Sequence, residues 1–220
     1  KNLSVPKTII AKNKIPVLCG GTGLYLESVI KKYNLIQVEK NEELRKTLSL
    51  KTDEELNKIL QKLKIVHNTT DSINRERMLR AIEIEEYNKL NPHPKSDMPD
   101  YTTTVFGINM ERSLVKEKIT KRLQERLGCG MMEEVKSLID SGISPERLKF
   151  YGLEYKYMTQ FILHEISFDE MFNLLNIAIH QFSKRQMTWF RRMEKNGIKI
   201  NWIDGTLPLE EKVKFMMNLI

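Results

Sequence analysis

The stretch IPVLCGGTGLYLES, residues 15–28, joins a short apolar run to a Gly-Gly-Thr-Gly turn and an apolar helical pattern. This order is typical of α/β nucleotide sites, in which a strand leads through a glycine turn into a helix. The Gly-Lys-Ser/Thr ending of a Walker loop does not follow. We therefore expect a buried strand over 14–19 and a helix over 22–32, and other segments of the chain must indicate the function of the turn.

The composition is that of an ordinary globular chain. Of its 220 residues, 40% are hydrophobic and 30% charged, and 36 basic against 29 acidic residues give a net charge of +7. That charge suits a polyanionic partner, but it equally describes a merely lysine-rich protein. No apolar run approaches the roughly 20 residues that span a bilayer, so we expect no membrane partner. Nothing about the two cysteines, Cys19 and Cys129, suggests a disulfide framework or a zinc site, which fits a reducing cytoplasm.

Periodicity and capping signals divide the chain into an α/β core and a helical insertion. Thr52 and Glu55 form a capping box before an amphipathic helix, and Asp71 is the expected N-cap of a helix ending near Leu90. Pro92, Pro94 and Pro99 indicate a linker. Beyond it we expect strands over 102–108 and 198–203, and helices over 112–127, 129–141, 167–195 and 208–219. The insertion then covers 36–98, and the core 1–35 and 99–220.

The helix over 167–195 carries an apolar stripe beside a polar, basic strip. The stripe, which we expect to lie in the core, consists of Phe168, Met171, Leu175, Ala178, Phe182, Trp189 and Met193. Gln186 lies at its edge, where a buried amide needs a partner. The neighbouring strip carries Gln181, Arg185, Thr188 and Arg192, and the far side carries Lys184 and Arg191. These side chains suit phosphate and base contacts, but a solvated basic face is the common alternative.

Three further groups allow a functional and a structural interpretation. Arg77 and Arg80 form either an outward cationic patch or ion pairs with Glu76 or Glu83. Arg122 borders a buried stripe, where it can contact a pyrophosphate or pair with Glu117 or Glu125. The segment 151–157, YGLEYKY, suits base stacking and phosphate contact, although tyrosines more often close a core.

Other chemistries find no support in the sequence. His67, His93, His164 and His180 are isolated from one another, so no metal-ligand cluster is indicated. Neither a Gly-x-Ser-x-Gly elbow nor a Ser/His/Asp order is present.

Five segments in this order resemble the tRNA dimethylallyltransferases, also called tRNA isopentenyltransferases. They are PVLCGGTGLY at 16–25, NRERMLRAIEI at 74–84, KITKRL at 118–123, YGLEYKYM at 151–158 and SKRQMTWFRR at 183–192. The resemblance implies transfer of a dimethylallyl group from dimethylallyl diphosphate, assisted by Mg²⁺, to the exocyclic N6 amine of the adenosine 3′ of the anticodon. It also implies a P-loop NTPase-like parallel-sheet core, whose helical insertion at 36–98 grips the anticodon stem-loop of a tRNA.

The same resemblance assigns expected roles to individual residues. Thr22 matches a threonine that places the adenine amine in the reaction channel, where Gly20 and Gly21 permit close approach of the backbone. Arg122 matches an arginine that contacts the diphosphate. The expected tRNA contacts are Arg77, Arg80, Tyr151, Gly152, Tyr155, Lys156, Gln181, Lys184, Arg185, Gln186 and Thr188.

Two features depart from the family pattern. The family begins with a Walker-type loop and an aspartate proposed as general base, and neither is found in this sequence, which begins at Lys1. We therefore expect an N-terminally incomplete core that is inactive alone, with the Mg²⁺ ligands in the missing segment and on the diphosphate. Glu154 also stands where a glycine is commoner.

Three functions remain as hypotheses at this point. The first is a monomeric, cytoplasmic tRNA dimethylallyltransferase. The second is a fragment that binds tRNA without chemistry. The third is a prenyltransferase acting on free adenine nucleotides, against which the helical insertion and the basic helix argue, because a mononucleotide has no stem to grip.

Overall fold

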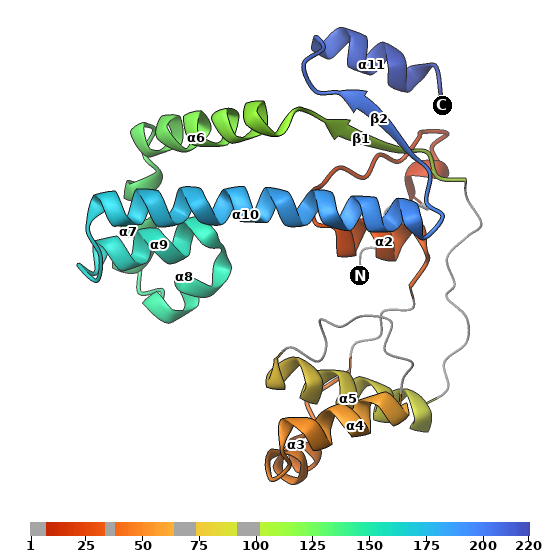
Figure 1. Ribbon diagram of the computed structural model, residues 1–220, viewed down its shortest axis with the longest axis vertical. Coiled ribbons are helices and arrows are strands. Elements are labelled where there is room, and N and C mark those ends of the chain that lie inside the picture. Colours follow the sequence, from red (N-terminus) through yellow and green to blue (C-terminus); the bar gives the residue numbers. More distant parts are fainter. Residues whose placement is uncertain (1–7, 34–37, 64–73, 92–101) are drawn as a thin grey trace. The chain divides into compact units, whose positions relative to one another are not determined.

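The computed structural model describes residues 8–33, 38–63, 74–91 and 102–220. It divides into two compact units (Figure 1). The helical unit contains the described residues between 31 and 100, and the α/β unit contains those of 6–30 and 101–220. Each unit has its own hydrophobic cluster.

The helical unit consists of α3 (Glu42–Ser49), α4 (Asp53–Leu63) and α5 (Arg75–Leu90). The predicted capping box of α4 is confirmed: Glu55 N–H donates to Thr52 Oγ1 over 3.3 Å, and Thr52 N–H donates to a Glu55 carboxylate oxygen over 2.8 Å. One apolar face of each helix meets in a cluster of Leu48, Leu56, Leu60, Met78, Leu79 and Ile82.

The predicted start of α5 is wrong. The helix begins at Arg75, and Asn74 is its N-cap, with Oδ1 accepting from the N–H of Glu76 over 2.8 Å. Asn and Asp are equally good N-caps, so the capping preference does not distinguish Asn74 from Asp71. Asn74 lies closer to the apolar pattern of the helix and is the N-cap in the structure. Asp71 itself, and the prolines taken as a linker, lie outside the described residues.

The α/β unit combines a parallel pair of strands with several helices. Its elements are α2 (Gly23–Ile30), β1 (Val105–Asn109), α6 (Arg112–Gly128), α7 (Met131–Asp140), α8 (Pro145–Tyr151), α9 (Leu153–Ile162), α10 (Phe168–Lys195), β2 (Ile200–Asp204) and α11 (Leu209–Met217). The strands are parallel and in register from Val105 opposite Ile200 to Asn109 opposite Asp204. The expected mixed α/β class with a parallel sheet is therefore present.

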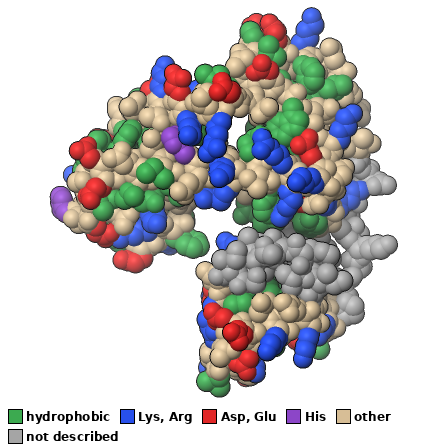
Figure 2. Space-filling model, in the orientation of Figure 1, with side chains coloured by type: hydrophobic (Ala, Val, Ile, Leu, Met, Phe, Trp, Pro, Cys, Tyr) green, Lys and Arg blue, Asp and Glu red, His purple; other side chains and the backbone are tan. Residues whose placement is uncertain are grey.

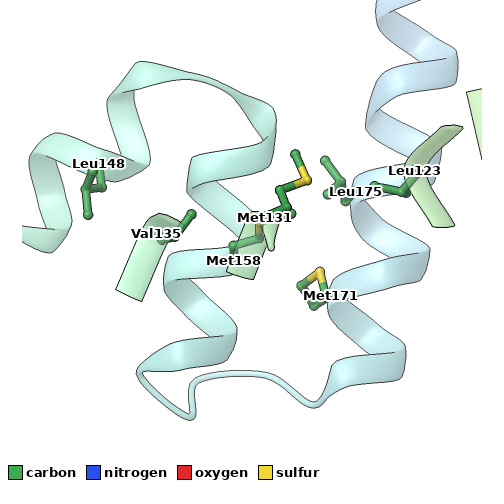
Figure 3. Packing of buried hydrophobic residues seen from close by; sticks show 7 residues of the cluster. All are labelled: Leu123, Met131, Val135, Leu148, Met158, Met171 and Leu175. Carbon is green, nitrogen blue, oxygen red and sulfur yellow. The ribbon is translucent and has the colours of Figure 1, made fainter. Parts of the chain in front are cut away.

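Helix α10 is the central element of this unit (Figure 1). A capping box of Ser167 and Glu170 starts it, as predicted. Helices α6 to α9 pack around its N-terminal half, and α2 contacts its C-terminal half. Figure 3 shows the cluster at the first contact, to which α6, α7, α8, α9 and α10 contribute Leu123, Met131, Val135, Leu148, Met158, Met171 and Leu175.

The apolar stripe of α10 is only partly buried. Met171, Leu175, Ala178 and Met193 lie in the core as predicted, whereas Phe168 and Phe182 are 48% and 42% exposed. Phe168 lies in the first turn and makes an edge contact with Phe161. Phe182 lies between the N-terminal stretch of α10, which α6 to α9 cover, and the C-terminal stretch, which α2 contacts. A position on the apolar stripe of a long helix is therefore buried only where another element covers it.

The predicted strand over 14–19 is wrong. Residues 14–20 have no regular secondary structure, and Ile15, Val17 and Leu18 are 62%, 83% and 60% exposed. A parallel strand is stable only beside hydrogen-bonding neighbours and between covered faces. In the described part of the chain, the only sheet is the β1–β2 pair, which leaves this segment without a neighbouring strand.

Helices α8 and α9 were not predicted, although a signal for α8 exists. Ser144 caps α8, its Oγ accepting from the N–H of Arg147 over 3.4 Å, and Pro145 occupies the first helical position. A Ser-Pro-Glu start of this kind is a recognised N-terminal pattern. Gly152 then separates α8 from α9 in an extended backbone conformation.

Candidate functional site

The Gly-Gly-Thr turn is attached directly to α10. Gln186 Nε2 donates a hydrogen bond to the carbonyl oxygen of Gly21 over 2.9 Å. A Cβ at Gly21 would overlap that same nitrogen, so the close approach requires glycine. This contact supplies the partner that the sequence required for Gln186.

The first turn of α2 continues the contact toward the C-terminus of α10. Gly23 lies against the indole ring of Trp189, where a Cβ would overlap the ring. One turn further, the buried carboxylate of Glu27 accepts from Trp189 Nε1 over 3.0 Å and from an Arg192 guanidinium nitrogen over 3.1 Å. The guanidinium carbon of Arg192 lies 3.9 Å from the centre of the Trp189 ring. Sequence reasoning missed Glu27, because its helical position gave no hint of a partner 162 and 165 residues away.

Thr22 is exposed between these attachment points. Its carbonyl oxygen accepts from the N–H groups of Tyr25 and Leu26, which starts α2. The carbonyl of Gly21 points to Gln186, and a trans peptide directs its C=O and N–H oppositely, so the N–H of Thr22 points away from α10. Gly20 is also exposed, and a Cβ there would contact no atom of the described residues.

The middle of α10 presents the predicted polar and basic side chains to solvent. Gln181, Lys184, Arg185 and Thr188 are exposed, and Thr188 Oγ1 donates to the carbonyl of Lys184 on the same helix. The Arg185 guanidinium lies 6.0 Å from the Phe182 ring centre. No salt bridge within the described ranges neutralises Lys184 or Arg185. Figure 2 shows Lys and Arg side chains gathered over α10, which makes this a cationic surface.

Arg122 lies exposed on α6, next to the buried Leu123. The described residues form no ion pair between Arg122 and Glu117 or Glu125, the alternative left open by the sequence. A hydrogen bond of 3.0 Å between Thr120 Oγ1 and Asn176 Oδ1 joins α6 to α10. The structure thus places both Arg122 and Thr22 on segments attached to α10, without a contact between them among the described residues.

The segment from Tyr151 to Lys156 forms a separate group at the N-terminal end of α10, away from the glycine turn (Figure 1). The Tyr155 hydroxyl donates to a Glu134 carboxylate oxygen over 2.6 Å, and this bond raises the pKa of Tyr155. Tyr151 accepts from Arg147 Nε over 2.7 Å, and the Lys156 ammonium lies 5.1 Å from the Tyr157 ring centre.

Glu154 and Tyr155 also line a hollow of about 230 Å³ together with Arg126, Met131, Glu134, Val135 and Met158. The carboxylate of Glu154 lies 3.8 Å from the Arg126 guanidinium. The residue that departs from the family pattern therefore takes part in an ion pair beside Tyr155. Gly152 needs no glycine-specific backbone conformation, since its φ of 164° is extended.

In the helical unit, the two candidate arginines differ. Arg77 is exposed, whereas Arg80 donates to Glu83 over 3.1 Å and to the carbonyl oxygen of Val38 over 2.5 Å. The Glu83 side chain is fully buried and also accepts from Arg45 Nε over 2.6 Å and from Asn41 N–H over 3.1 Å. Burial alone would raise the pKa of Glu83, but the hydrogen bonds from Arg45, Arg80 and Asn41 lower it to about 2. Of the two alternatives, pairing with Glu83 therefore holds for Arg80.

Over the described ranges, no group of three or more His, Cys, Asp and Glu side chains is arranged to hold a metal ion. No described helix is long and apolar enough to cross a bilayer.

These features define a mixed α/β protein in which a glycine turn is attached to a cationic helix and a separate helical unit carries an exposed arginine. A family model described as IPP transferase matches residues 3–193. The chain belongs to this family. It is 51% identical to tRNA dimethylallyltransferase 2 of Bacteroides fragilis, over 97% of this chain and 70% of that protein. It is 45% identical to tRNA dimethylallyltransferase 2 of Porphyromonas gingivalis, over 96% of this chain and 70% of that protein.

Solved structures of similar proteins agree with the fold. A tRNA delta(2)-isopentenylpyrophosphate transferase from Staphylococcus epidermidis superposes with a TM-score of 0.58 at 26% identity, covering 98% of this chain and 73% of that one. A tRNA isopentenylpyrophosphate transferase from Bacillus halodurans gives a TM-score of 0.64 at 24% identity, covering 99% and 69%. The latter similarity concerns the fold alone.

Proposed function

We propose that the protein is a tRNA dimethylallyltransferase that prenylates the N6 amine of the adenosine 3′ of the anticodon. The observation that carries the proposal is 51% identity to a tRNA dimethylallyltransferase over 97% of the chain. The cationic surface of α10 supports it, because Lys184 and Arg185, which form no salt bridge within the described ranges, suit an RNA backbone. The expected P-loop-like core belongs to this proposal as well.

In the proposed reaction the allylic C1–oxygen bond of dimethylallyl diphosphate breaks, and the adenine N6 forms a bond to C1. The amine loses one proton and diphosphate leaves. Thr22 has an exposed hydroxyl and a backbone N–H directed away from α10, so it can place the amine by hydrogen bonding. Arg122, exposed and without an ion pair among the described residues, would hold the departing diphosphate.

The proposed tRNA contacts fall into three groups. The first is Arg77 with the neighbouring Arg80 on α5, and the second is the segment from Tyr151 to Lys156. The third is on α10, where Gln181, Lys184, Arg185 and Thr188 are exposed, while Gln186 contacts the glycine turn. Base flipping out of the anticodon loop would bring the adenine to Thr22.

Magnesium is part of the proposal only as a companion of the diphosphate, whose hard oxygen atoms suit it. The protein ligands of the ion are proposed to lie outside the 220 residues, since the described ones contain no group of three or more His, Cys, Asp and Glu side chains arranged to hold a metal ion. We further propose a cytoplasmic monomer; the exposed, free Cys19 and Cys129 suit a reducing compartment.

The test is transfer of labelled dimethylallyl diphosphate to an anticodon stem-loop by the complete gene product, with Mg²⁺ present. A stem-loop with guanosine at the acceptor position is the matched control, and AMP tests the free-nucleotide alternative. We expect label only in the adenosine stem-loop. Stem-loop binding without transfer would contradict the proposal, and so would faster transfer to AMP.

Thr22→Ala separates placement of the amine from RNA binding, with Thr22→Ser as the variant that keeps the hydroxyl. We expect Thr22→Ala to lower kcat about 10²-fold, while the stem-loop Kd changes less than about 3-fold. Thr22→Ser should retain most of the activity. A loss of affinity without a loss of kcat would contradict this role.

A further inference from the structure

Glu27 is a buried acidic residue that the proposed reaction does not use. Its residue exposure is 2%, and its Oε2 accepts hydrogen bonds from both Trp189 and Arg192. We name Glu27, Trp189 and Arg192 the Glu27 cluster. A carboxylate this deeply buried is costly unless it is paired and hydrogen-bonded, so its partners restrict where α2 can lie.

The Glu27 cluster continues a line of attachments along α10. Gln186, Trp189 and Arg192 are spaced at three-residue intervals, which places them along one side of the helix. They contact Gly21, Gly23 and Glu27 respectively, in the same order along the α2 segment. Shifting α2 by one turn along α10 would leave the Glu27 charge without Arg192 and move Gly21 away from Gln186.

Thr22 lies between the first two of these attachments and has no side-chain hydrogen bond to α10 among the described contacts. Its position is therefore set by its neighbours. The bond from Gln186 is a single neutral hydrogen bond to a part-buried carbonyl, whereas Glu27 makes one charge-assisted bond and one indole bond in a buried site.

We propose that Glu27 is a positioning residue, which holds the Gly21–Thr22 turn against α10 through Trp189 and Arg192. The catalytic consequence of this inference rests on the proposed function, in which Thr22 places the substrate amine. The positional consequence does not rest on it, because the attachment of the turn can be measured without any reaction.

The structural arm of the test compares Glu27→Ala and Glu27→Gln with Ser28→Ala in the complete gene product. Ser28 is also buried in α2, but its hydroxyl bonds to the carbonyl of Tyr25 in the same segment. We expect amide hydrogen exchange over residues 20–26 to rise about 10-fold or more in Glu27→Ala and to change less than about 3-fold in Ser28→Ala. Glu27→Gln keeps an oxygen acceptor for Trp189, so its exchange over residues 20–26 should lie between that of Glu27→Ala and that of Ser28→Ala.

Trp189 provides an independent spectroscopic readout. The 220 residues contain two tryptophans, Trp189 and Trp202, so a Trp202→Phe background of this 220-residue chain isolates the Trp189 emission. In that background, Glu27→Ala should shift the emission, because the indole loses its carboxylate partner and the Arg192 guanidinium loses its anchor. Unchanged emission together with unchanged exchange at 20–26 would overturn the proposal.

The kinetic arm measures kcat and stem-loop Kd on the same variants. We expect Glu27→Ala to lower kcat about 10-fold with the Kd within about 2-fold, and Ser28→Ala to change neither. If Glu27→Ala and Ser28→Ala lower kcat equally, the loss reflects general destabilisation of α2, and the positioning role is overturned. If Glu27→Ala does not fold, the Glu27→Gln values decide by the same criteria. Absence of transfer by the wild-type protein would contradict the proposed function alone, since exchange and emission still decide the position of the turn.

Discussion

The side-chain amide of Gln186 donates a hydrogen bond to the carbonyl oxygen of Gly21 across 165 positions of the sequence. This bond connects the two most characteristic segments of the chain, the Gly-Gly-Thr turn and the basic helix. Gln186 was expected to contact tRNA, but its amide nitrogen is used within the protein. Its role is therefore at least partly to orient the peptide that precedes Thr22.

Alanine substitutions at three neighbouring glycines should have graded effects on the free energy of unfolding. Gly23→Ala places a Cβ within the Trp189 ring, whose displacement we expect to cost about 1–3 kcal/mol. Gly21→Ala displaces only the end of the Gln186 side chain and should cost about 1 kcal/mol, the value of the lost hydrogen bond. Gly20→Ala, which meets open space, is the control and should stay within about 0.5 kcal/mol. Denaturant unfolding measures all three, and a Gly20 effect as large as that of Gly23 would contradict this packing.

Arg77 and Arg80 should separate into a binding residue and a structural residue. Arg80→Ala removes a partner of the buried Glu83 and should destabilise the helical unit by about 1–3 kcal/mol. Arg77→Ala removes an exposed side chain and should leave stability within about 0.5 kcal/mol. In salt titrations of stem-loop binding, Arg77→Ala should reduce the slope of log K against log salt by about 1. Loss of stability in Arg77→Ala, or its absence in Arg80→Ala, would reverse the assignment.

Acid should weaken the helical unit through Glu83. The pKa of Glu83 is about 2 in the folded protein and 4.5 ordinarily, so its contribution is complete above pH 4.5 and is lost as the pH falls toward 2. A shift of this size corresponds to about 3 kcal/mol. Glu83→Gln should therefore destabilise the protein near neutral pH and flatten the acid dependence of denaturant unfolding.

The partly exposed Glu86 on the same helix, which pairs with Lys89 at 3.6 Å, provides the control. Glu86→Gln should keep the wild-type loss of stability between pH 4.5 and 2. If Glu83→Gln keeps that loss as well, the acid sensitivity belongs to other groups.

Charge removal on α10 should weaken RNA binding in a salt-dependent manner. Lys184→Ala and Arg185→Ala should each lower stem-loop affinity and reduce the salt slope by about 1, because each is expected to neutralise one phosphate. Lys136→Ala, which removes an exposed lysine from α7, is the matched control and should change neither quantity. Filter binding or fluorescence anisotropy at several salt concentrations gives both values. If the slope of log K against log salt is the same in the wild-type protein and in all three variants, α10 does not contact the phosphates.

The local signals in the sequence predicted local structure well. The capping boxes of Thr52 with Glu55 and Ser167 with Glu170 start α4 and α10 as expected, because both partners lie within one helical turn. Helix α8 carried a similar signal in Ser144 and Pro145 that could have been used. The strand predicted over 14–19 is not formed for the opposite reason, since a strand depends on neighbouring strands that its own residues do not encode.

By itself, the sequence determined the starts of α4 and α10, the mixed α/β class and the motifs that indicate the family. Only the tertiary structure decided that Gln186 contacts Gly21, that Arg80 pairs with Glu83 while Arg77 is exposed, and that Glu27 joins Trp189 to Arg192. Periodicity assigns a side chain to a face of its own helix. Its hydrogen-bond partner comes from another segment of the chain, which periodicity does not identify. Because a buried polar group without a partner is costly, such a partner must be present in the folded protein.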